Sequence, residues 1–416
     1  MFNWSDWLGP VTQSTPVVQW SLLLAMAAAA GHLLQRYFGL PKVLGYSITG
    51  ALAGFLGFTN APWPLQGIGL FMVELGLSIV LFEAGGRLTL RWFRHNPMLL
   101  AQSLAESLAT YLAILWVLQW LEVDAALRTP LALLAVASSP AVLMRVASDI
   151  RASGPVTDRA ITLAGLNTLY VLALGGGMAR FLGQSDASFA QAALPVIILL
   201  SLSILFGAAL ALALHTALRY MSASSENTSV LMLALVAATT TWCANLGGSA
   251  PLAALLAGSL LKSLHPRPWS WSRQFGTASS ILTILMFVLV SMAAAQADWH
   301  LLSWQLIAAL VLVRTLAKGL GIGLANLGSG ASLKQSFWTA SAMWPMSAVA
   351  LLLLSQFVQY LPQLATQLAA IALPLILCME MLGALMSTVA LQRAGEAHLA
   401  LGKPVSHRTQ EPGDGP

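Results

Sequence analysis

Four ionisable side chains lie deep inside long apolar runs of the sequence, where water is scarce and charge is costly. Glu106 is about 14 Å from the start of its run, counted at about 1.5 Å per helical residue. Arg314 and Lys318 are four residues apart, so they share one face of a helix. Glu380 is near the middle of the last run. Ionisable residues at membrane depth are functional candidates by default, so these four are candidates to bind or carry an ion or a proton.

Two of the apolar runs are interrupted by polar residues and proline. Ser138 and Ser139 precede Pro140 in one run, and Pro345 lies in a similar break in another. A broken membrane helix exposes backbone groups that bind ions, and breaks at matching positions of two halves indicate a transporter's site. The alternative is an ordinary proline kink packed against neighbouring helices. The matched positions favour a site.

Asn167 and Thr168 add neutral polar groups about 12 to 14 Å into the run that follows the first break. Two interpretations of the whole set stay open. Its charges could form buried salt bridges without a transport role, because unpaired charge in lipid is costly. Alternatively, they form a proton-coupled ion site in which a carboxylate or the amine of Lys318 changes protonation.

The composition indicates that lipid surrounds the elements that position these residues. The chain has 416 residues, of which 57% are hydrophobic and only 8% are charged. Soluble domains carry about 25% charged residues, so we expect a polytopic membrane protein. Cys243 and Cys378 lie inside apolar runs, which excludes a secreted disulfide scaffold.

Thirteen apolar runs approach the length of about 20 residues that a helix needs to span a bilayer. We number them as spans 1 to 13; spans 2 and 9 are short. The expected fold is all-α, with spans at 17–34, 43–58, 66–84, 97–118, 130–147, 159–182, 190–217, 229–245, 250–264, 275–296, 301–325, 335–357 and 364–392.

Lys and Arg are distributed unevenly between the two sides of the predicted membrane. Sixteen of the 20 lie in one set of loops and ends, two lie in the opposite set, and two lie inside span 11. Cytoplasmic loops carry the positive excess, so we expect residues 1–16 to be extracytoplasmic and residues 393–416 to form a disordered cytoplasmic tail. The membrane expected is a bacterial-type cytoplasmic (inner) membrane. The net charge of +5 is thus a topology signal, and no nucleic-acid partner is expected.

An internal repeat is visible in two short stretches. Gly45-Tyr-Ser-Ile-Thr-Gly-Ala-Leu-Ala-Gly in span 2 resembles Ser249-Ala-Pro-Leu-Ala-Ala-Leu-Leu-Ala-Gly in span 9, and the charge distribution gives these spans opposite directions. The two proline breaks lie in spans 5 and 12, three spans further on in each case. We therefore predict that spans 1–6 and 8–13 are inverted repeats joined by span 7.

Four stretches together carry a resemblance to a known family. They are Gly39-Leu-Pro-Lys-Val-Leu-Gly-Tyr, Glu74-Leu-Gly-Leu-Ser-Ile-Val-Leu-Phe-Glu-Ala-Gly-Gly, Pro251-Leu-Ala-Ala-Leu-Leu-Ala-Gly and the pair Arg314 and Lys318. In order and spacing they resemble motifs of the monovalent cation/proton antiporter superfamily, which includes the sodium/hydrogen exchangers.

The resemblance extends over most of the chain, from about residue 17 to 392. It implies a transmembrane transporter domain of thirteen helices in a lipid bilayer. Spans 1–3 and 8–10 would form a dimerisation part, and spans 4–6 and 11–13 a mobile core in which two broken helices cross. It also implies a homodimer that exchanges sodium or potassium ions for protons by an elevator-like motion.

The sequence departs from the family pattern at one important position. The sixth helix of the family carries an Asn-Asp or Asp-Asp pair, whereas this chain has Asn167 and Thr168. Ser138 and Ser139 likewise replace a Thr-Asp pair that is often found at the first break. Thr168 offers only a neutral oxygen, so the usual carboxylate is missing.

Three hypotheses follow from that departure. In the first, the chain is an active antiporter with a relocated carboxylate, for which Glu106, paired with Lys318, is the first candidate and Glu380 the second. In the second, the same fold carries an anionic or zwitterionic solute near Arg314 and the positive ends of the broken helices. In the third, the chain is a sensor or scaffold that transports nothing.

Motifs for other chemistry are missing from the sequence. It has no cluster of metal ligands, no phosphate-binding loop and no catalytic triad signature. We therefore expect no enzyme activity, no cofactor and no resident metal.

Overall fold

The computed structural model describes residues 16–57, 63–88, 96–183, 189–222, 224–265, 273–299, 303–326, 329–346 and 348–397, and regular structure in this part is entirely helical. Residues 1–15 of the predicted extracytoplasmic segment and residues 398–416 of the predicted tail lie outside the described residues.

Each predicted span overlaps one helix or two helices that follow each other in the chain. In chain order the elements are α2 (Pro16–Phe38), α3 (Lys42–Phe55), α4 (Gly67–Gly85), α6 (Pro97–Trp120), α7 (Ala125–Val136), α8 (Pro140–Asp149), α9 (Pro155–Tyr170), a π-helical turn (Val171–Gly175), α10 (Gly176–Leu182), α11 (Phe189–Tyr220), α12 (Glu226–Asn245), α13 (Ala250–Leu264), α14 (Arg273–Ala295), α15 (Trp304–Leu324), α16 (Leu333–Ala342), α17 (Ala348–Tyr360), a 3₁₀ turn (Pro362–Leu364) and α18 (Ala365–Arg393).

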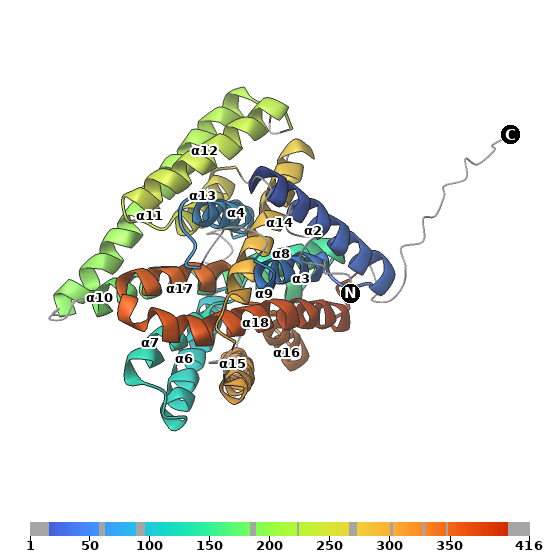
Figure 1. Ribbon diagram of the computed structural model, residues 1–416. Coiled ribbons are helices and arrows are strands. Elements are labelled where there is room, and N and C mark those ends of the chain that lie inside the picture. The colour runs from blue at the N-terminus through green and yellow to red at the C-terminus, as the bar shows by residue number, and fades with distance from the viewer. Residues whose placement is uncertain are drawn as a thin grey trace.

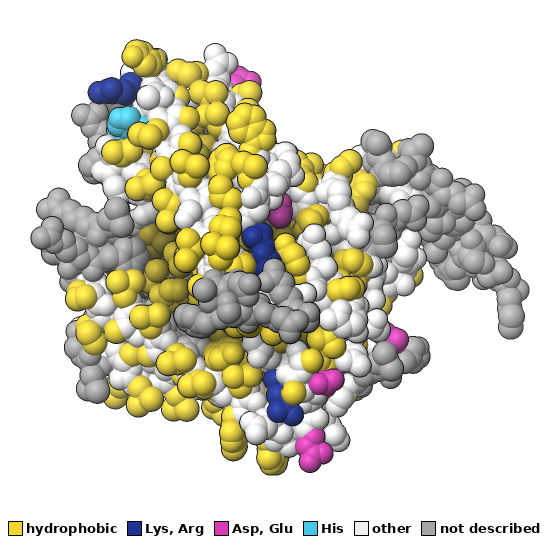
Figure 2. Space-filling model, turned by 90° about the vertical axis from the view of Figure 1, so that its left-hand side faces the viewer, with side chains coloured by type: hydrophobic (Ala, Val, Ile, Leu, Met, Phe, Trp, Pro, Cys, Tyr) yellow, Lys and Arg dark blue, Asp and Glu magenta, His cyan; other side chains and the backbone are white. Residues whose placement is uncertain are grey.

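Ten helical segments in the described part are long and apolar enough to cross a membrane. Two of these segments combine helices, α7 with α8 and α9 with α10. The helices α3, α13, α16 and α17 are shorter, so the number of thirteen crossings stays a prediction. Hydrophobic side chains are spread over the face seen in Figure 2 and few charged ones lie among them, as expected of a surface in contact with lipid.

The helices pack in reciprocal pairs. Span 3 packs on span 9 (α4 on α13) as span 10 packs on span 2 (α14 on α3). Likewise, span 5 contacts span 13 (α7 and α18) as span 12 contacts span 6 (α16 and α9), and the two fourth helices of the halves, α6 and α15, pack on each other. This exchange of partners is what two repeats related by a two-fold axis produce.

In Figure 1, α17 and α18 run across the middle, with α2, α4 and α12–α14 above them and α6, α7, α15 and α16 below. We call α2–α4 and α12–α14 the scaffold group, and α6–α10 and α15–α18 the crossing group. Glycines bring scaffold helices close together: a Cβ at Gly85 would collide with the carbonyl of Leu255, and one at Gly258 with that of Phe82. Such close backbone contact is typical of helix pairs in membranes.

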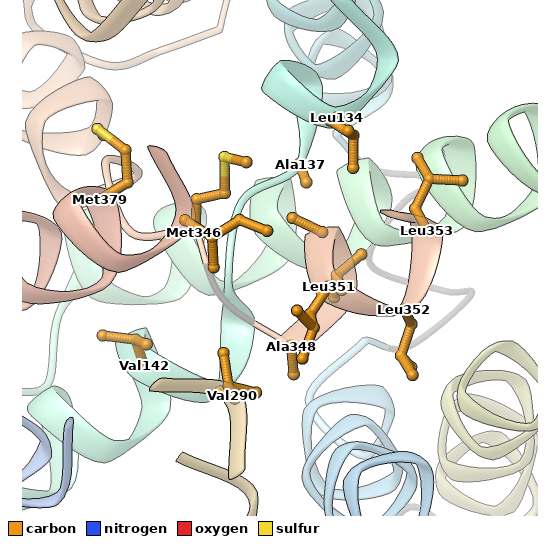
Figure 3. Packing of buried hydrophobic residues seen from close by; sticks show 14 of the residues in the cluster. Leu134, Ala137, Val142, Val290, Met346, Ala348, Leu351, Leu352, Leu353 and Met379 are labelled. Carbon is orange, nitrogen blue, oxygen red and sulfur yellow. The ribbon is translucent and has the colours of Figure 1, made fainter. Parts of the chain in front are cut away.

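Both predicted breaks are present in the crossing group. The helix α7 ends at Val136, and α8 begins at Pro140 with Ser139 as its N-cap, whose hydroxyl accepts from the N–H of Val142 at 3.3 Å. Proline suits this first helical position because its missing N–H has no partner to lose there. In the second half, α16 ends at Ala342 and α17 begins six residues later. Apolar side chains from both breaks pack together in Figure 3.

Candidate functional site

The two breaks are hydrogen-bonded to each other where they cross. The backbone N–H of Ser139 donates to the carbonyl of Pro345 at 2.8 Å. The hydroxyl of Ser138 donates to the carbonyl of Met343 at 3.1 Å, and both serines are buried. These bonds satisfy the backbone N–H of Ser139 and the carbonyls of Met343 and Pro345.

Arg314 joins the two breaks a second time. Its Nε donates to the carbonyl of Ala135 at 2.8 Å and its Nη2 to that of Ala137 at 2.6 Å, both at the end of α7. Its Nη1 donates to the carbonyl of Trp344 at 2.7 Å, in the second break. The side chain is fully buried. A cation suits this place, because the carbonyl end of a helix is the negative end of its dipole.

Lys318, one turn further along α15, forms an ion pair with Glu106 of α6. Its ammonium donates to the Glu106 carboxylate and, at 3.0 Å, to the carbonyl of Val136. Both side chains are fully buried. The structure therefore brings together two residues that are 212 positions apart, directly beside the end of the first half-helix.

Asn167 connects this ion pair to the first break. The Ser107 hydroxyl donates to its Oδ1 at 2.8 Å and lies 3.4 Å from the Glu106 carboxylate. The Asn167 amide nitrogen is 3.5 Å from both the carbonyl of Val136 and the hydroxyl of Ser138. Sequence reasoning missed Ser107, although its position next to Glu106 was an available signal.

Thr168 is buried beside Asn167 but turns its proton away from the site. Its hydroxyl donates to the carbonyl of Ala164 in its own helix at 2.9 Å. The oxygen keeps acceptor capacity and no negative charge. Asn167 and Thr168 are thus both neutral, and the buried carboxylate linked to Asn167 through Ser107 is that of Glu106 on α6.

Glu380 belongs to a different environment from Glu106. It is fully buried on α18, and its Oε1 accepts from Ser47 of α3 at 2.7 Å and from Ser291 of α14 at 3.2 Å. Both serines come from the scaffold group, so Glu380 lies where the two groups meet. The sequence analysis assigned Glu380 to the same candidate site as the other ionisable residues. Nothing in the sequence pattern indicated that these serines are its partners.

A second contact between the groups lies at the end of α8. The Asp149 carboxylate accepts from the backbone N–H of Lys42 at 3.0 Å, is 3.8 Å from the Lys42 ammonium and is 3.5 Å from Nε of Arg145. Arg145 in turn donates to the Tyr46 hydroxyl at 3.0 Å. The network holds the two groups together at the side that the charge distribution predicts to be cytoplasmic.

The comparison with protein families decides the assignment. The profile described as sodium/hydrogen exchanger, transmembrane, matches residues 22–391. The chain belongs to the sodium/hydrogen exchanger family. This is a family of transporters and not a class of enzymes. No curated protein matches the sequence.

Solved structures agree with the exchanger fold. The sodium proton antiporter MjNhaP1 from Methanocaldococcus jannaschii, in its structure at pH 8, superimposes with a TM-score of 0.68 at 16% identity, covering 91% of this chain and 97% of that one. A second structure of that antiporter, from an electron-microscopy map, gives a TM-score of 0.58 at 18% identity and covers 90% and 88%. At such identities the likeness establishes the fold alone.

Proposed function

We propose that this exchanger exchanges a monovalent cation, sodium or potassium, for protons, and that Glu106 is the relocated carboxylate. The observation that carries the proposal is the buried pair of Glu106 and Lys318 beside the carbonyl of Val136. Membership of the sodium/hydrogen exchanger family supports it, as does the likeness to a sodium proton antiporter. We further propose a homodimer in a bacterial-type inner membrane, with the N-terminus outside and the C-terminus in the cytoplasm.

The pair provides a physical means of coupling. In the absence of a metal ion, the Lys318 ammonium satisfies the Glu106 carboxylate, because an unpaired charge at this depth is costly. A cation that binds the carboxylate and the Val136 carbonyl repels the ammonium and favours release of its proton. When the cation leaves, a proton returns to the amine and the pair forms again. Cation and proton thus compete for one site, as exchange requires.

The hypothesis of an anionic or zwitterionic solute has less support. It needs a cationic side chain with donors directed at the solute. Each guanidinium nitrogen of Arg314 donates to a backbone carbonyl, and the ammonium of Lys318 donates to Glu106 and Val136. No contact in the described part favours the sensor or scaffold hypothesis over exchange.

Everted membrane vesicles that contain the protein test the proposal. A pH-sensitive dye reports a proton gradient imposed by respiration, and sodium, potassium or lithium chloride is then added. We expect at least one of the three salts to collapse the gradient, with choline chloride as the inactive control. If none of the three collapses it in vesicles with confirmed, folded protein, monovalent cation/proton exchange is the wrong function.

A further inference from the structure

A large cavity lies between the scaffold and crossing groups, away from the Glu106 and Lys318 pair. Its volume is about 1060 Å³, and α4, α12 and α13 on one side and α10 and α17 on the other contribute its walls. The polar lining includes Glu74, Gln356, Ser355, Thr241, Asn245 and Arg180. It reaches the helix ends that the charge distribution assigns to the outside, opposite to the Asp149 network.

Glu74 is the acidic residue in this lining. It lies seven residues from the start of α4, which is about 10 Å along the helix at about 1.5 Å per residue. It forms neither a hydrogen bond nor an ion pair with any residue that the structure describes. A carboxylate at membrane depth needs a partner, and the cavity gives Glu74 access to water, a proton or a cation.

Gln356 of α17 supplies a second oxygen of this kind. Its Oε1 is buried and accepts no hydrogen bond within the described part of the chain. The backbone of Gly176 lies close behind it, since a Cβ at that glycine would be 2.9 Å from the same oxygen. Gln356 lines the cavity as Glu74 does, and α17 contacts α4, so rotation of the Gln356 side chain presents its amide oxygen to a cation in the cavity.

Arg180, the basic residue in the lining, is bound elsewhere. Its Nη2 donates to the carbonyl of Gly247 at 3.0 Å, and its guanidinium lies 5.9 Å from the ring centre of Tyr360. It forms no ion pair with Glu74, whose negative charge therefore stays available to a mobile cation. Oxygen ligands of this type are what sodium and potassium ions bind, in a space wide enough to keep part of their hydration shell.

We propose that this cavity is a second, outer binding site for the transported monovalent cation, with Glu74 and Gln356 as oxygen ligands. The cation is held between the two groups before it reaches the crossing. The identity of this ion as the transported cation rests on the exchange function proposed above. The presence of a cation site in the cavity does not rest on that function, because it depends only on the cavity and on the oxygens of Glu74 and Gln356.

Two readouts test the site. In right-side-out vesicles, whose outer face meets the added salt, Glu74→Gln should raise the apparent KM for the active cation about tenfold, which corresponds to about 1.4 kcal/mol of lost binding, with a smaller effect on kcat. Gln356→Leu should raise KM less, by about threefold. Glu122→Gln, which changes an exposed carboxylate after α6, is the matched control and should leave KM unchanged.

The second readout is binding of radioactive sodium or rubidium to the purified protein in detergent. Glu74→Gln should bind less than the unaltered protein at equal amounts of folded protein, while Glu122→Gln should bind equally. Unchanged binding and KM in folded Glu74→Gln overturn the outer site and leave the exchange proposal intact. Absence of exchange in the unaltered protein overturns the exchange proposal, and the binding measurement then still decides the outer site.

Discussion

The ammonium of Lys318 donates to the carboxylate of Glu106, and the two fully buried side chains join α15 to α6. In a soluble protein, such a pair often contributes little net stability, because desolvation of both charges offsets their attraction. Here the same ammonium also donates to the carbonyl of Val136, at the end of a half-helix. The pair therefore stabilises the first break as well as the contact between the two helices.

Loss of one partner should destabilise the protein more than loss of both. Glu106→Gln or Lys318→Met leaves one charge buried and unpaired, which costs about 3 to 5 kcal/mol. The double variant removes both charges and should recover most of that loss. Thermal unfolding of the purified proteins in detergent, followed by tryptophan fluorescence, measures the order. A double variant less stable than both single variants contradicts a direct pairing.

Exchange should depend on the Glu106 charge even where the fold is retained. The double variant Glu106→Gln with Lys318→Met has no titratable group in the pair, so we expect exchange in everted vesicles to fall at least about 100-fold. Glu122→Gln serves as the matched control, because that carboxylate is exposed after the end of α6. Normal exchange by the double variant would assign the carrier role to another residue, with Glu380 as the next candidate.

Arg314→Lys should fail to replace arginine although the charge is kept. The guanidinium reaches three carbonyls in fixed directions, and a single ammonium cannot reach Ala135, Ala137 and Trp344 together. We expect a loss of about 3 kcal/mol in stability, from two lost hydrogen bonds to a charged group. Unfolding by denaturant or heat measures this, and a lysine variant as stable as the parent protein would show that the charge alone suffices.

Two glycines of the crossing group provide a matched pair of substitutions. A Cβ at Gly383 would collide with the backbone of Pro345 in the second break, whereas one at Gly319 meets no atom within 4 Å. Gly383→Ala should cost about 1 to 3 kcal/mol and reduce exchange, since overpacking displaces the break. Gly319→Ala should be neutral or stabilising by up to about 1 kcal/mol, because alanine favours the helix. Equal unfolding midpoints for the two variants would contradict this account.

Glu396 should contribute to stability although it follows the last helix. Its carboxylate accepts from the backbone N–H groups of Val156 and Thr157, both at 2.7 Å, and so caps the start of α9. Glu396→Ala should cost about 1 to 2 kcal/mol, as loss of a helix cap does. The exposed Glu122→Ala is the control for thermal unfolding. Identical midpoints in the two variants would mean that the cap contributes nothing.

Much of the helical framework was predictable because lipid restricts the sequence strongly. Apolar length predicted the spans, and Pro140 and Pro345 marked both breaks, since proline removes a donor at a defined place. Membership of the exchanger family and the antiporter fold, suggested by motifs such as the one beginning at Glu74, are confirmed. The predicted roles of the site residues stay predictions.

The partners of the charged residues were harder to predict. Hydrophobic length gives the depth of a side chain but not its rotation towards a particular neighbour. The carbonyls that bind Arg314 carry no sequence signal, because every residue has one. The serines around Glu380 come from helices in the other group, and such long-range contacts follow from packing. The π-helical turn at Val171–Gly175, inside span 6, was likewise not visible in the apolar pattern.

The double connection between the breaks has a consequence for how tightly exchange is coupled. The backbone N–H of Ser139 donates a hydrogen bond to the carbonyl of Pro345, and the guanidinium of Arg314 donates to carbonyls in both breaks. Opening of one break alone would therefore cost these hydrogen bonds. A half-open crossing would be a continuous path for ions, and the hydrogen bonds between the described parts of the two breaks oppose it. We therefore expect a protein that passes ions only in complete cycles, with negligible leak current.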